Sequence, residues 1–448
     1  MRLKTILDSH SGFRFFFENL NLQSSVARQV LMETVMLQSA REISNYYAEL
    51  EEFYHIFARE DKFTYTLLNI SNKLSSLRDI RGTISRLEDG AVLDDIELYE
   101  IKGLALLNED IKTLFEGTFI KTILFENLSA IVDLLDPEGH KITSFYIYDH
   151  YSEELKNIRN EVRKESKYSN ELLYKASLME DRIRKELCTQ LIAFTSMLRN
   201  TINTLAKIDI LIAKSLQINE LKLCIPIVSK EITSYTALFN PEIKEIIAKE
   251  GRSFQNIDIS FATTKPVLIT GANMGGKTVV LKTLALSQYL YQFGFGIPSK
   301  EAEIVPVHEI HFCIGDEQNI YKGLSSFAAE MRRIDNVIKA VRSGKNILAL
   351  IDEPARTTNP TEGTALVKAL IRILSGMNFR MVITTHYNID TDTCKRLRVK
   401  GYENGTMNYQ LIEDFSTESP QEALQIARSL GIDNEWVEEA EKIVKKII

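Results

Sequence analysis

Residues 271–278, GANMGGKT, combine glycines, a lysine and a threonine at a spacing that suits phosphate binding. They follow the apolar run VLIT, precede a helical pattern and fit G-x-x-x-x-G-K-[ST], a loop whose backbone N–H groups turn inward on phosphates. The N-terminus of the following helix adds partial positive charge. We expect Lys277 to reach the terminal phosphates and Thr278 to place its hydroxyl on Mg²⁺, whereas a turn that serves only tight packing is disfavoured. The candidate nucleotide ligands of this loop are Gly271, Ala272, Asn273, Met274, Gly275, Gly276, Lys277 and Thr278.

Two adjacent carboxylates, Asp352 and Glu353, end the apolar run ILALI. Beside a phosphate loop, Asp352 is expected to hold Mg²⁺ directly or through water, and Glu353 to polarise the attacking water as a general base. Acids in this position also cap helices, and the phosphate loop decides between the two interpretations. His386 ends the third apolar run, MVITTH, where we expect it to sense the γ-phosphate rather than to be purely structural.

The histidines and cysteines outside these motifs do not have the spacing of a metal site. His308 and His311 alternate within a strand-like segment with no further histidine or cysteine nearby, which favours surface positions over a metal site. The four cysteines, Cys188, Cys224, Cys313 and Cys394, form no C-x-x-C pair. We therefore expect packing residues in a reducing compartment rather than disulfides or a zinc site.

The elements that position these residues divide the chain into two parts. VLIT, ILALI and MVITT are unbroken apolar runs between helical segments, typical of buried parallel strands. We predict an α/β domain over residues 226–448, preceded by an all-α domain over residues 1–225. Only one proline precedes residue 226, at Pro137.

The predicted all-α domain contains long amphipathic patterns. No glycine or proline lies between Tyr151 and Cys224, and one apolar stripe runs from Leu187 to Ile212, so we predict a continuous helical arm. A helix of about 50 residues would be roughly 75 Å long. Residues 25–80 are also expected to be helical, and residues 135–150 to form a short hairpin before the arm.

Composition and charge limit the classes of function. The 44% apolar and 26% charged content is that of a soluble globular protein, and no window offers the roughly 18 apolar residues of a membrane span. We expect a cytoplasmic protein without a membrane partner. The net charge of −7 lacks the usual electrostatic signature of a nucleic-acid-binding protein, although a local basic stripe can suffice.

Taken together, these motifs resemble those of the MutS ATPases within the ABC superfamily. TGANMGGKT is similar to that family's phosphate loop, with Ala272 in place of the usual proline, and TTHY matches its histidine segment. GDEQNIYKGLSSFAAEM resembles the signature segment, whose serine, here Ser325, the family supplies to the ATP of the opposite subunit. Phe254 lies where members stack an aromatic ring on adenine. DEPARTTNPTEG matches the acidic segment but departs from mismatch-repair members at Pro354, Ala355 and Thr357.

The resemblance implies a head-to-tail dimer that uses ATP and Mg²⁺ and closes on ATP binding. Each composite site would need Lys277 from one subunit and Ser325 from the other. Residues 418–446 look like the family's C-terminal helical dimerisation segment. The dimer is either a homodimer or a heterodimer with a paralogous MutS-like subunit, and its long helices would act as levers.

The same resemblance leaves two functions open. The helical pattern begins almost at residue 1 and lacks room for the family's mismatch reader, connector and clamp. LSSLRDIRGTISRLEDGAVLDDIELYEI resembles a reader-less bacterial paralogue, which continues into a nuclease module where this sequence ends. We therefore favour a remodeller of a protein client, similar to the reactivases of cobalamin-dependent aminomutases. The alternative is a repair or recombination ATPase that binds branched or damaged DNA.

For the DNA alternative, candidate contacts lie on the arm. They are Lys156, Arg159, Arg163, Lys164 and Lys167. Glutamates interleave with these residues, which favours a solvated, salt-bridged helix face over a DNA surface.

Overall fold

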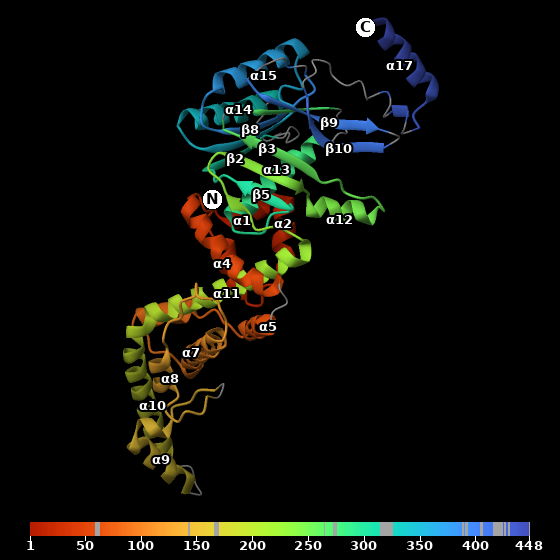
Figure 1. Ribbon diagram of the computed structural model, residues 1–448. Coiled ribbons are helices and arrows are strands. Elements are labelled where there is room, and N and C mark those ends of the chain that lie inside the picture. Colours follow the sequence, from red (N-terminus) through yellow and green to blue (C-terminus); the bar gives the residue numbers. More distant parts are fainter. Residues whose placement is uncertain are drawn as a thin grey trace.

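The computed structural model describes the chain except for residues 59–62, 142–143, 165–169, 264, 272–275, 314–325, 388, 390–392, 404–405, 415–423, 425–426, 429–430 and 448. Two β-sheets and their covering helices lie at one end of the molecule, and α9 and α10 lie at the other (Figure 1). No helix in the described part is long and apolar enough to cross a membrane.

Helices precede the first strand. They are α1 (Leu3–Ser9), α2 (Ser11–Glu18), α3 (Ser25–Glu33), α4 (Ala40–Ala58), α5 (Phe63–Leu74), α6 (Arg81–Glu88), α7 (Asp95–Glu116), α8 (Ser129–Leu135), η1 (Asp149–Tyr151), α9 (Glu153–Lys164), α10 (Asn170–Leu191), η2 (Ile192–Phe194) and α11 (Thr195–Leu221). The helical pattern expected over residues 25–80 is thus divided among α3, α4 and α5.

The predicted continuous arm is wrong in one respect. The 3-10 turn η2 separates α10 from α11, and α9 packs against α10 (Figure 1). The apolar stripe itself is confirmed, since Leu187, Leu198 and Ile212 are all buried. No glycine or proline marks the break. After the break, α11 packs against α3, α4, α5, α6 and α7. These contacts are made by residues distant in sequence, so a local sequence pattern does not reveal them.

The predicted hairpin is also wrong, because residues 136–141 and 144–148 contain no strand. A buried polar cluster holds this segment instead. Lys102 of α7 pairs with Asp136 at 2.8 Å and donates to the Tyr148 hydroxyl at 2.9 Å, and both side chains of the ion pair are fully buried. The Lys141 N–H donates to the second Asp136 oxygen at 2.7 Å. These side-chain contacts replace a strand ladder.

Replacing Lys102 by Met should lower the free energy of unfolding by about 3–5 kcal/mol, because the Asp136 carboxylate would remain buried without its cation. Lys73→Met is the matched control, since it breaks the Lys73–Asp110 contact of the same 2.8 Å at exposed side chains. The control should cost less than about 1 kcal/mol. Urea unfolding followed by circular dichroism measures both changes. Equal losses in the two variants would contradict this assignment.

The rest of the described chain is mixed α/β, as predicted. Its strands are β1 (Ile227–Val228), β2 (Ile232–Leu238), β3 (Ile257–Ala262), β4 (Val267–Thr270), β5 (Glu301–Ile304), β6 (Glu309–Cys313), β7 (Ile347–Asp352), β8 (Arg380–Thr384), β9 (Lys395–Glu403) and β10 (Thr406–Glu413). Its helices are α12 (Pro241–Lys249), α13 (Lys277–Gln292), α14 (Ser326–Arg342), α15 (Pro360–Leu374) and α17 (Asn434–Ile447). The strands formed by VLIT, ILALI and MVITT are confirmed as β4, β7 and β8.

The two sheets have the orders β1-β5-β2-β3 and β10-β9-β4-β8-β7-β6. In the larger sheet, β6, β7, β8, β4 and β9 are parallel, and β10 is antiparallel to β9. One buried apolar cluster runs from the helical part into this half, where Phe13 packs edge-on against Phe293 and Phe295. The boundary at residues 225 and 226 stays a prediction.

Candidate functional site

Three parallel strands end at one edge of the larger sheet. Thr384 at the end of β8 pairs in register with Ile269 of β4 and with Asp352 of β7. Because parallel strands point the same way, the residues after all three ends are brought together. This edge therefore carries Gly271, Glu353 and His386.

Two glycines flank the part of the phosphate loop that lies outside the described residues, 272–275. Gly271 has φ +133°, and a Cβ there would come 3.1 Å from the Val399 Cβ. Gly276 has φ +72°, and its Cβ would come 3.1 Å from the ring of Tyr409. Both positions thus require glycine. Helix α13 begins at Lys277, directly after Gly276, and the backbone N–H groups of a helix N-terminus suit an anion.

The Asp352 carboxylate accepts two hydroxyl hydrogen bonds. Thr278 donates to one oxygen at 2.7 Å, and Thr384 donates to the other at 2.5 Å. The Thr278 hydroxyl and the Asp352 carboxylate are the hard oxygen ligands that Mg²⁺ prefers, so the residues present fit this ion. Thr384 was missed by the sequence analysis, although its place two residues before His386 was a usable signal.

Glu353 lies beside the phosphate-loop lysine. Lys277 donates to the Gly271 carbonyl at 2.7 Å, and its Nζ lies 3.3 Å from the Glu353 carboxylate. Arg356 contacts the other Glu353 oxygen at 3.2 Å. Lys277 is 2% exposed and Glu353 12%, so these charges meet in a largely desolvated place. A positioned carboxylate next to a phosphate-binding lysine is an arrangement that can activate water.

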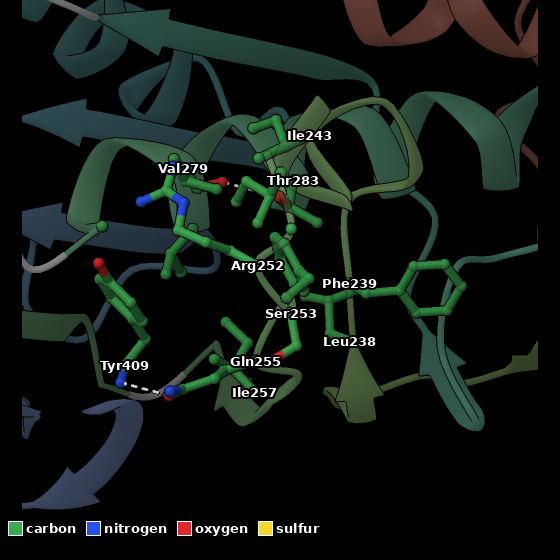
Figure 2. Close-up of a pocket in the computed structure, with 15 residues that line it drawn as sticks. Leu238, Phe239, Ile243, Arg252, Ser253, Gln255, Ile257, Val279, Thr283 and Tyr409 are labelled. Atoms are coloured by element: carbon green, nitrogen blue, oxygen red, sulfur yellow. Dashed lines mark hydrogen bonds between the residues drawn. The ribbon is translucent and has the colours of Figure 1, made fainter. Parts of the chain in front are cut away.

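A cavity of about 660 Å³ opens beside the start of α13 (Figure 2). Phe254, Gly276, Val279 and Tyr409 are among its lining residues, and its volume is that of typical small-molecule sites. The Tyr409 N–H donates to Gln255 at 2.8 Å, which ties β10 to the segment that carries Phe254. Tyr409 was also missed, because no motif surrounds it. The assignment of Phe254 to adenine stacking stays a prediction.

The remaining predicted residues are placed as follows. His386 is exposed after β8, with its ring centroid 4.4 Å from that of Tyr387. Ser325 lies outside the described residues. His308 accepts from the Asn346 N–H at 3.0 Å, and His311 contacts Glu309 at 3.0 Å. No cluster of three or more histidine, cysteine or acidic residues suited to a metal occurs in the described ranges.

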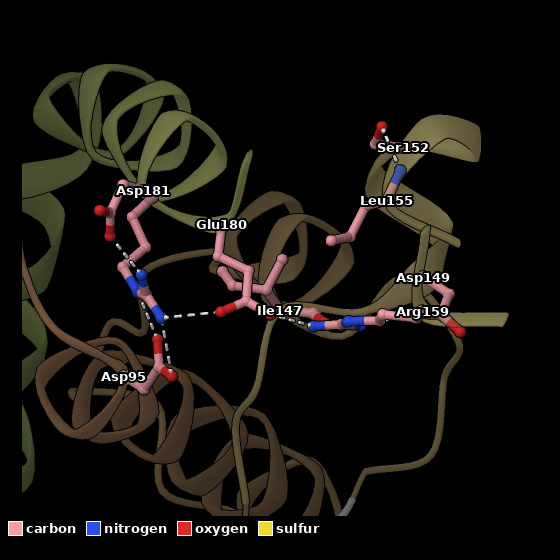
Figure 3. Close-up of polar contacts among 9 residues, drawn as sticks. Asp95, Ile147, Asp149, Ser152, Leu155, Arg159, Glu180 and Asp181 are labelled. Carbon is pink, nitrogen blue, oxygen red and sulfur yellow. Dashed lines mark hydrogen bonds and ion pairs between the residues drawn. The ribbon is translucent and has the colours of Figure 1, made fainter. Parts of the chain in front are cut away.

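Two of the basic residues of the arm, Lys156 and Arg159, make ion pairs within the chain. Arg159 contacts Asp149 at 2.5 Å and Glu180 at 2.7 Å, and it donates to the Ile147 carbonyl at 2.8 Å (Figure 3). Lys156 contacts Glu153 at 3.4 Å. Lys167 and the side chain of Lys164 lie outside the described part. For Lys156 and Arg159, the salt-bridged interpretation is therefore confirmed.

Comparisons with known proteins find relatives of this chain. Residues 267–448 match the family model described as MutS domain V. The chain is 31% identical to a protein named Endonuclease MutS2 from Enterococcus faecalis, over 59% of this chain and 33% of the relative. It is 28% identical to the protein of that name from Pediococcus pentosaceus, over 84% of this chain and 47% of the relative. It is 26% identical to a protein of the same name from Streptococcus thermophilus, over 94% of this chain and 62% of the relative.

The chain thus spans between one third and about three fifths of the length of these curated relatives. The family match is to residues 267–448, and these three relatives all carry the name Endonuclease MutS2.

Proposed function

We propose, from the match of residues 267–448 to MutS domain V, that the chain binds ATP with Mg²⁺ and hydrolyses it. The observation that carries this proposal is the contact of Thr278 with Asp352 beside the Lys277–Glu353 pair. All four residue types match their expected roles in phosphoryl transfer.

Each residue has a separate task in this mechanism. Lys277 and the N-terminus of α13 bind the phosphates, and Glu353 takes the proton from the attacking water. Thr278 and Asp352 would hold Mg²⁺, which neutralises charge on phosphate oxygens when bound. Phe254 would stack on the base, and His386 would contact the γ-phosphate. Ser325 from the partner subunit would complete the site.

Contacts at the far end of α13 support a lever mechanism. Lys214 of α11 is buried and donates to the Phe293 carbonyl at 2.7 Å and to the Tyr46 hydroxyl at 2.8 Å. Tyr47 of α4 donates to the Tyr291 carbonyl at 3.1 Å. The helix that starts at the phosphate loop therefore ends on the helical part of the chain. A shift of α13 would be passed directly to α4 and α11.

The dimer is proposed from the resemblance and from α17. This helix leaves Trp436 70% exposed and Ile443 51% exposed, as a helix that packs against a second subunit would. Either a homodimer or a heterodimer is compatible with these positions.

For the partner, we propose branched or damaged DNA in preference to the protein client that the sequence favoured. The support is the name of the curated relatives, Endonuclease MutS2, since an endonuclease cuts nucleic acid. Remodelling of a protein such as a cobalamin-dependent aminomutase is the second candidate. It is favoured by the ion pairs that occupy Arg159 and Lys156.

Steady-state ATP hydrolysis tests both candidates. The purified chain is assayed alone, with branched and with mismatched duplex DNA at low and high salt, and with an inactivated cobalamin-dependent aminomutase. Lys277→Ala controls for contaminating ATPases. Stimulation by DNA that fades with salt supports the DNA proposal, because phosphate contacts release counterions. Stimulation by the aminomutase alone supports the second candidate. An absence of hydrolysis under every condition contradicts the ATPase itself.

A further inference from the structure

The turn that follows β7 has an unfavourable backbone conformation. Glu353 has φ +43° and Ala355 has φ +61°, and neither residue is glycine. L-residues adopt this left-handed region only where surrounding contacts hold them there. The turn carries the proposed general base, so whatever holds it also sets the position of the Glu353 carboxylate.

Two side chains from different elements hold Ala355 by its backbone. The Ala355 N–H donates to Glu330 of α14 at 2.9 Å, and the Ala355 carbonyl accepts from the Tyr387 hydroxyl at 2.8 Å. Ala355 is 1% exposed and Tyr387 6%, so water does not replace these bonds. Burial raises the pKa of Glu330, with an opposing effect from its bond to the Ala355 N–H.

The residues around Tyr387 leave room for its ring and hold its backbone. Gly363 of α15 leaves the space that Tyr387 fills, since a Cβ at that position would come 2.4 Å from the tyrosine oxygen. The Tyr387 N–H donates to the Thr385 hydroxyl at 3.0 Å. On the other side of the turn, the Glu353 N–H donates to the carbonyl of Thr384 at 3.1 Å. The general base and the residues that follow β8 are thus joined through the turn.

We propose that Glu330 and Tyr387 are positioning residues for Glu353: together they hold the Ala355 peptide groups so that the carboxylate faces the phosphate-loop lysine. This inference rests on the proposed ATPase and deepens it. Both residues bond to the Ala355 backbone, two positions after Glu353. Their loss should therefore change the rate of the chemical step and leave nucleotide affinity unchanged.

The test compares kcat, KM and nucleotide Kd among variants of the full chain. Glu330→Leu and Tyr387→Phe should each lower kcat for ATP by about 10- to 100-fold, the range expected for misplaced catalytic groups, with Kd unchanged. Glu330→Gln should retain kcat, because an amide oxygen still accepts from the Ala355 N–H. The double variant should lose less than the product of the two single losses, because both act through one residue.

Tyr151→Phe is the matched control. It also removes a tyrosine hydroxyl that donates to a backbone carbonyl at 2.8 Å, but that carbonyl belongs to Leu134 in the helical part. Its kcat should equal that of the unmodified chain. Thermal unfolding of every variant shows whether the fold is kept, and Tyr387→Phe, which loses only one hydroxyl, stays informative if Glu330→Leu does not fold.

The outcomes separate this inference from the proposed function. If the unmodified chain does not hydrolyse ATP, the ATPase proposal fails. If it hydrolyses ATP and Tyr387→Phe keeps full kcat, the positioning role is overturned while the ATPase proposal stands. A rise in KM or Kd with unchanged kcat would equally overturn the positioning role, since it would place these residues in binding.

Discussion

Glu353→Gln keeps nucleotide binding and lowers kcat for ATP by about 10²- to 10⁴-fold, the range of a lost general base. Glutamine has nearly the same shape but cannot take the proton from the attacking water. It also removes the negative charge 3.3 Å from Lys277, which favours bound phosphate. The bound but uncleaved ATP should hold the dimer closed, so the variant accumulates in the closed state.

Phosphate release measures hydrolysis, a fluorescent nucleotide measures Kd, and small-angle scattering with ATP measures closure. Glu362→Gln is the control, because it makes the same chemical change at an exposed position of α15. Full hydrolysis in Glu353→Gln would overturn the assignment of the base. A loss of nucleotide binding in the same variant would place Glu353 in binding instead.

Lys277→Ala should weaken ATP binding by about 100-fold or more, since charge-assisted hydrogen bonds worth about 3 kcal/mol correspond to roughly that factor. The lysine is 2% exposed and lies at the first residue of α13, where its ammonium is desolvated and unscreened. Lys282→Ala is the matched control, because this residue of the same helix is exposed. Titration with a fluorescent ATP analogue measures both variants, and an unchanged Kd in Lys277→Ala would contradict the proposed phosphate site.

Pro354, Ala355 and Thr357, which differ from the residues of mismatch-repair members, lie in the turn after β7. Ala355 occupies a left-handed conformation, and its carbonyl accepts from Tyr387 and from the Thr358 N–H at 3.2 Å. A turn held by side chains does not need glycine at this position. The departures therefore do not remove Glu353 from its place beside Lys277.

The sequence by itself determined three strands of the larger sheet, β4, β7 and β8, and the residues at their ends. VLIT, ILALI and MVITT are apolar throughout, because helices or other strands cover both faces of a parallel sheet. Once three such strands run in parallel, their carboxyl ends must meet. The proximity of Thr278 and Asp352 follows from spacing and strand direction alone.

Only the tertiary structure decided the break at η2, the absence of the hairpin, and the contacts of Tyr409 and Glu330. Each of these depends on partners distant in sequence. The Tyr409 N–H bonds to a residue 154 positions away, and the bond from Ala355 to Glu330 joins the turn after β7 to α14. Local propensity and periodicity carry no information about such partners. The packing energy that favours them exists only after the chain has folded.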